Sequence, residues 1–191
     1  MTARSARRLW AAMLVLLVSA AGARADLNLF GGYFDNVARA ASHNDASQVR
    51  QLVVGGNSPN EFDETGRTGL QIAAINGNLQ IAAILIKASA NLNVKDGLGN
   101  TALHYATDRN HVEMAQLLLD VGAAVDPENK NGMTPLMIAA NRGNIVIVQA
   151  LLAKGANARK TDFTGRDALG WAADSRRPVV IQALQRAQAK H

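Results

Sequence analysis

The sequence repeats itself with a period of 33 residues, and this period constrains the fold more than any other feature. The copies share a Gly, a Thr or Asp two residues later, and a Leu two residues after that; they begin at Asp63, Asp96, Asn129 and Asp162. A fixed period of this length indicates stacked supersecondary units, each burying its apolar face against its neighbours. We therefore expect an elongated solenoid rather than a single closed core.

Each copy predicts a tight turn, a short helix and a second helix. The turn position that requires a positive φ is occupied by Gly66, Gly99, Gly132 and Gly165. Helix N-cap residues follow at Thr68, Thr101, Thr134 and Asp167. A residue able to adopt left-handed dihedral angles ends the first helix at Gly77, Asn110 and Gly143, whereas Arg176 departs from this rule. The second helix carries apolar residues at helical spacing, such as Met114, Leu117 and Leu118.

The period predicts five units, at 30–62, 63–95, 96–128, 129–161 and 162–191. In the leading unit, Gln48 and Gln51 replace apolar residues, and a polar outer face is what a terminal repeat needs for solubility. The second helix of most units ends at a glycine, but Ser89 takes that place in one of them. This position implies a left-handed backbone, so Ser89 is expected to be strained.

Four stretches carry a family resemblance: Thr-Pro-Leu-Met-Ile-Ala-Ala at 134–140, Thr-Ala-Leu-His-Tyr-Ala at 101–106, Leu-Leu-Leu-Asp-Val-Gly-Ala at 117–123 and Leu-Leu-Ala-Lys-Gly-Ala at 151–156. In register, they resemble the ankyrin repeat family, and most closely its small exported bacterial members. The resemblance implies an all-α solenoid of helix-turn-helix units with β-hairpin-like turns, three full repeats lying between divergent end units.

The chain departs from the family pattern at several places. Gly69 and Gln71 replace the usual Pro and His, and the His is also missing at Met137 and Gly170. In this family, a structural histidine forms a hydrogen bond to the backbone of a neighbouring repeat. The resemblance therefore implies such a histidine only at His104.

The N-terminus reads as a secretory signal peptide over residues 1–25. Arg4, Arg7 and Arg8 precede an apolar run at 9–22, and Ala23-Arg24-Ala25 predicts cleavage before Asp26. A run of 14 residues spans about 21 Å as a helix, short of the roughly 30 Å hydrocarbon core. We expect export to the bacterial periplasm by the Sec route, without a stable membrane anchor after cleavage. The Arg7-Arg8 pair leaves a twin-arginine route open, although the residues after it fit that pattern poorly.

The chain has no cysteine, which excludes a disulfide scaffold, a thiolate metal site and lipid attachment to a cysteine. Four of the 20 basic residues lie in the leader, which leaves 16 against 15 acidic residues. The mature chain is thus nearly neutral, and we expect no nucleic-acid partner. Its charge is uneven: 26–141 holds 7 basic and 12 acidic residues, and 142–191 holds 9 and 3.

The titratable residues predict no enzyme, metal site or cofactor. The histidines (His43, His104, His111 and His191) lack metal-ligand spacing, and His111 is expected to be solvated or to cap a helix. The turn aspartates Asp63, Asp96 and Asp162 lie one repeat apart, roughly 10 Å in a stack, and are expected to bond their own turns. The sequence contains no phosphate-binding glycine fingerprint.

The resemblance places a protein partner on the concave side, formed by turn tips and first helices. The candidate binding residues are Arg67, Leu98, Asn100, Arg109, Lys130, Met133, Arg142, Phe163 and Arg166. Leu98, Met133 and Phe163 are either an exposed apolar contact row or fold inward onto neighbouring turns. We expect a monomeric, non-enzymatic binding scaffold. The alternatives are an immunity protein that neutralises a periplasmic toxin, or a protective partner of an exported redox enzyme such as a catalase.

Overall fold

The computed structural model describes residues 36–189. The predicted signal peptide, its cleavage site before Asp26 and the start of the leading unit lie outside the described residues, as do Lys190 and His191.

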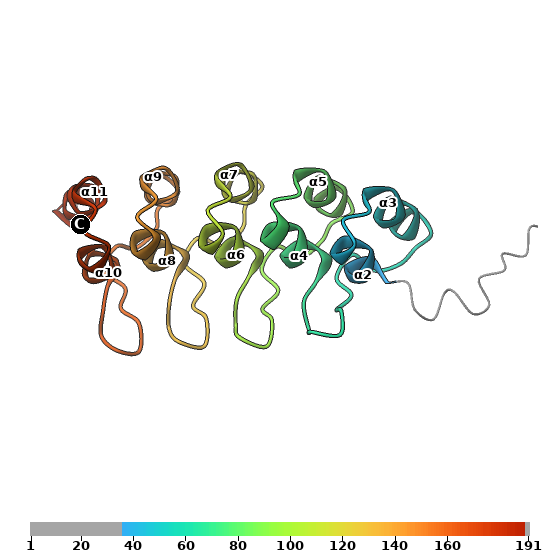
Figure 1. Ribbon diagram of the computed structural model, residues 1–191, viewed down its shortest axis with the longest axis horizontal. Helices are drawn as coiled ribbons and strands as arrows, with labels where there is room; N and C mark the ends of the chain where they lie inside the picture. Colours follow the sequence, from blue (N-terminus) through green and yellow to red (C-terminus); the bar gives the residue numbers. More distant parts are fainter. Residues whose placement is uncertain (1–35, 190–191) are drawn as a thin grey trace, which may run out of the picture. The chain divides into compact units, whose positions relative to one another are not determined.

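Within this part of the chain, the helices form two rows that follow the sequence in pairs (Figure 1). The inner row, from which the long turns extend, consists of α2 (Val37–Ser42), α4 (Gly69–Asn76), α6 (Ala102–Asp108), α8 (Pro135–Arg142) and α10 (Ala168–Ser175). The outer row consists of α3 (Ala46–Val54), α5 (Leu79–Lys87), α7 (Val112–Asp120), α9 (Ile145–Ala153) and α11 (Pro178–Ala189). Each inner helix packs against the inner helices of the adjoining repeats and against its own outer helix. The predicted all-α solenoid is confirmed.

The turns between repeats are hairpin-like, as expected. Antiparallel bridges join Phe62 to Thr68 and Thr161 to Asp167 at the bases of two turns. Gly132 has a φ of 75°, and an added Cβ there would lie 2.7 Å from Cδ1 of Phe163 in the next turn. Glycine is therefore needed both for the turn and for the close approach of neighbouring turns.

The predicted helix boundaries are confirmed at the caps. The Thr68 and Thr134 side chains accept hydrogen bonds from the third helical N–H, and the Asp167 carboxylate does the same in the last unit. Gly77 and Asn110 end their helices with φ values of 68° and 62°. The predicted departure at the last of these sites is wrong, because Arg176 also adopts a left-handed conformation, with a φ of 52°.

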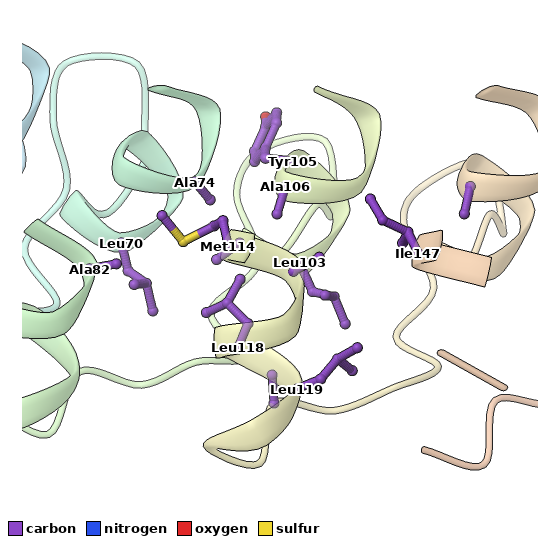
Figure 2. Packing of buried hydrophobic residues seen from close by; sticks show 14 of the residues in the cluster. Leu70, Ala74, Ala82, Leu103, Tyr105, Ala106, Met114, Leu118, Leu119 and Ile147 are labelled. Atoms are coloured by element: carbon purple, nitrogen blue, oxygen red, sulfur yellow. The ribbon is translucent and has the colours of Figure 1, made fainter. Parts of the chain in front are cut away.

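The core is a continuous layer that each repeat extends. Leu103 of α6 is fully buried, and Figure 2 shows it with Met114 and Leu118 of α7, between Leu70 of one neighbouring repeat and Ile147 of the other. Small residues such as Ala74 and Ala106, also fully buried, let the inner helices approach closely. No helix within residues 36–189 combines the length and the hydropathy required of a membrane span.

Candidate protein-binding face

Hydrogen bonds between a side-chain oxygen and backbone N–H groups of the same turn stabilise each turn. The Asp96 Oδ1 atom accepts hydrogen bonds from the N–H groups of Leu98 and Asn100, both at 2.9 Å. The equivalent bonds recur in the other turns, at Asp63, Asn129 and Asp162. The hypothesis that the aspartates stabilise their own turns is confirmed, and it leaves each turn as a rigid projection beside the inner helices.

Electrostatics support this role of the carboxylates. Burial by itself would raise the pKa of Asp162, but hydrogen bonds from Thr164, Arg166 and Trp171 outweigh it and hold the pKa below its usual value. The Trp171 indole N–H lies 3.0 Å from the second carboxylate oxygen. The oxygens of such a carboxylate already accept hydrogen bonds from their own turn, which keeps the group charged. It therefore has little capacity for general acid or base chemistry.

A hollow of about 330 Å³ lies between the turns and the inner helices of the third and fourth units, 96–128 and 129–161. We call it the central hollow; its lining residues are Leu98, Asn100, His104, Tyr105, Asp108, Asn129, Met133, Ile138 and Asn141. Apolar side chains from a turn, from α6 and from α8 thus meet amide groups in one depression. This mixture is typical of a recognition surface.

His104 has the structural role that the family resemblance implied. Its Nδ1 accepts a hydrogen bond from the Thr101 N–H at 3.1 Å, so the proton is on Nε2, which donates to the Met133 carbonyl oxygen at 3.1 Å. Burial lowers the pKa of His104 to about 4. The neutral imidazole therefore ties the inner helix of one repeat to the turn of the next.

Gln71 takes over the same task one repeat earlier. Its side-chain Oε1 accepts a hydrogen bond from the Thr68 N–H at 2.8 Å, and its Nε2 donates to the carbonyls of Val94 and Asn100. Sequence reasoning missed this role of Gln71. The signal was available, because a glutamine carries one acceptor and one donor group at about the reach of the two imidazole nitrogens.

Of the two expectations for His111, capping is wrong, and the side chain is only partly exposed to solvent. Although it occupies the N-cap of α7, its side chain makes no capping hydrogen bond. Instead, Nε2 donates to the Ile75 carbonyl at 3.1 Å, and the ring fills the space where Gly77 lacks a side chain. The physical reason is the neighbouring glycine: a Cβ at Gly77 would lie 2.8 Å from the His111 ring.

The predicted apolar row is only partly exposed. Leu98 and Phe163 expose 60% and 75% of their surface. Met133 is half-buried and packs against the core, so its interpretation as an exposed turn-tip residue is wrong. It lies where the chain returns from the turn to α8; its apolar side chain is partly removed from water, and its carbonyl accepts a hydrogen bond from His104.

Three of the predicted arginines are engaged within the chain. The Arg67 guanidinium lies 5.4 Å from the centre of the Tyr105 ring, and its Nε is 4.0 Å from the carboxylate of Asp96. Arg142 Nε donates to Asp108 at 3.0 Å. Arg166 pairs with Asp174 and lies 4.5 Å from the centre of the Trp171 ring. These contacts hold the three guanidinium groups in place beside the turns and the inner helices.

The remaining predicted residues divide by position. Asn100 lines the central hollow and accepts a hydrogen bond from Asn129, while Arg109 and Lys130 are exposed next to hollow-lining residues. Phe163 and Arg166 belong to the next turn and do not line the hollow. Tyr105 and Ile138 do line it but were missed, because a helix-periodic aromatic or aliphatic residue is more often part of the core.

A stack of helix pairs with projecting turns defines this chain as a repeat solenoid, a class that binds through extended surfaces rather than through one deep pocket. A comparison with protein families gives a match to ankyrin repeats, described as three copies, over residues 37–129 and 121–190. The chain belongs to the ankyrin repeat family. Ankyrin repeats generally mediate protein–protein binding and are typically non-catalytic. No curated protein matches the chain.

Proposed function

We propose that the chain is a non-enzymatic protein-binding scaffold that acts in the bacterial periplasm. The observation that carries the proposal is the central hollow, with the 60% exposed side chain of Leu98 on its wall. An apolar residue on a turn that its own aspartate holds rigid loses little conformational freedom on binding. Full burial of a leucine side chain contributes about 1.5–3 kcal/mol, so burial of the 60% of Leu98 that is exposed contributes about 1–2 kcal/mol.

The periplasmic setting is supported by the leader. The basic start, the apolar run at 9–22 and the small residues Ala23 and Ala25 have the form of a cleavable signal peptide. N-terminal sequencing of the protein from fractionated cells should start at Asp26. An intact N-terminus in a soluble cytoplasmic pool would contradict this part of the proposal.

The binding face can be tested by site-specific photo-crosslinking in living cells. A photoreactive residue at Leu98 or at Phe163 should capture the same partner, since both side chains project from turns on the same face. The matched control is Val146 at the start of α9 in the outer row, which exposes 52% of its surface.

We expect one shared crosslinked product from the two turn positions and none of that product from Val146. Capture of the partner from Val146 alone would place binding on the outer helices and reject the proposed face. The absence of any protein product from all three positions would reject a protein-binding role.

A further inference from the structure

The cations along the binding face fall into two groups. Arg67, Arg142 and Arg166 each lie against a carboxylate of the chain itself, those of Asp96, Asp108 and Asp174. Arg109 and Lys130 are exposed, and their side chains form no ion pair among the described residues. The positive charge of the first group is locally balanced, so the second group dominates the charge that a partner meets.

Each of these two cations is the sequence neighbour of a residue that lines the central hollow, one on a helix and the other on a turn. Arg109 directly follows Asp108 at the end of α6, and Lys130 directly follows Asn129 in the next turn; both preceding residues line the hollow. The one carboxylate in that lining, Asp108, already pairs with Arg142. The depression is therefore apolar and amide-lined, with uncompensated positive charge beside it at a helix end and at a turn.

From this arrangement, and resting on the proposed function, we infer that the partner presents an acidic segment with one apolar anchor side chain. The anchor fills the central hollow against Leu98, Tyr105 and Ile138, and flanking Asp or Glu residues pair with Arg109 and Lys130. A basic segment is disfavoured, since like charges across an interface are repelled. The side-chain amide of Asn141, which also lines the hollow, can form hydrogen bonds with the backbone of an extended segment beside the anchor.

A phage-displayed library of random peptides, selected on the purified protein, tests the inference while the natural partner is still unidentified. Selected peptides should carry Leu, Ile, Met or Phe flanked by Asp or Glu, and their affinity should fall as salt is raised. The double variant Arg109→Glu/Lys130→Glu should bind them at least about tenfold more weakly. The matched control, Lys87→Glu/Arg186→Glu, reverses two exposed cations of the outer helices and should bind as the parent does.

Selected peptides that are neutral or basic, or that bind both double variants equally, would overturn the inference. So would a failure to enrich any peptide, or a labelled single-stranded oligonucleotide that binds as well as the peptides do. These outcomes are distinguishable from failure of the proposed function. If basic or neutral peptides still compete with the crosslink from Leu98, the binding face stands and only the acidic chemistry is wrong.

Discussion

Ser89 is the position where a single substitution should stabilise the solenoid. Its φ is 62°, and the equivalent residues Gly56, Gly122 and Gly155 have values of 95°, 92° and 87°. A non-glycine residue in the left-handed region costs about 1–2 kcal/mol. Glycine also makes the unfolded chain more flexible, which offsets about 0.4–1 kcal/mol of this gain. Ser89→Gly should therefore raise the free energy of unfolding by several tenths of a kcal/mol or more.

Two matched substitutions separate backbone strain from side-chain effects. Gly122→Ser places a side chain where no atom lies within 4 Å of the new Cβ, so its cost in the folded state, about 1–2 kcal/mol, comes from the dihedral angles. The stiffer unfolded chain offsets about 0.4–1 kcal/mol of that cost. Ser47→Gly makes the same chemical change as Ser89→Gly, but inside α3, where glycine is a poor helix former. Urea denaturation followed by circular dichroism should place Ser89→Gly above the parent in stability, and Ser47→Gly and Gly122→Ser below it. A less stable Ser89→Gly protein would refute the reasoning.

Three further changes test contacts between repeats. The pKa of His104 is about 4 in the folded protein and about 6.5 in the unfolded chain, so its contribution to the free energy of unfolding is complete above pH 6.5 and is lost as the pH falls toward 4. His104→Gln should reduce this loss of stability in urea melts, and an unchanged pH profile would argue against the buried neutral imidazole. Gly132→Ala should destabilise the protein more than Gly165→Ala: both glycines have a positive φ, but only a Cβ at Gly132 would meet the Phe163 ring. Equal losses of unfolding free energy in the two variants would show that the contact with Phe163 relaxes. Arg142→Ala should lower the free energy of unfolding by less than about 1 kcal/mol, because its pair with Asp108 is exposed, and a larger loss would give Arg142 a packing role.

Most of the fold could be predicted from the sequence because the same types of turn, capping and core residue recur in each repeat. The turn glycines, the capping threonines and the buried leucines act within one unit, and the 33-residue period confirms each assignment several times. The period predicts a left-handed conformation at Ser89, and the structure has it there. The prediction for Arg176 is wrong, since residue type was given more weight than the register that the other units define.

The binding face was harder to predict, because it depends on contacts between repeats. The sequence shows that Arg67 is charged, but not that it lies over the Tyr105 ring of the next repeat. Likewise, the sequence places Met133 in a turn, but not its side chain against the core or its carbonyl within hydrogen-bonding distance of His104. The sequence also does not show that Arg109 and Lys130 lack an ion-pair partner among the described residues. This follows only from the structure, in which the other cations of the face lie against carboxylates.

The central claim, that a protein partner docks on the face of turns and inner helices, is tested most directly by the affinity of two double variants for the crosslinked partner. Leu98→Ala/Phe163→Ala removes two exposed apolar side chains of that face, and Val146→Ala/Val179→Ala removes two exposed apolar side chains of the outer helices, at 52% and 63% exposure. The first variant should bind at least about thirtyfold more weakly, which corresponds to about 2 kcal/mol, with the cooperative melt preserved. The second should bind as the parent does. Full affinity in the first variant and a loss in the second would contradict the account.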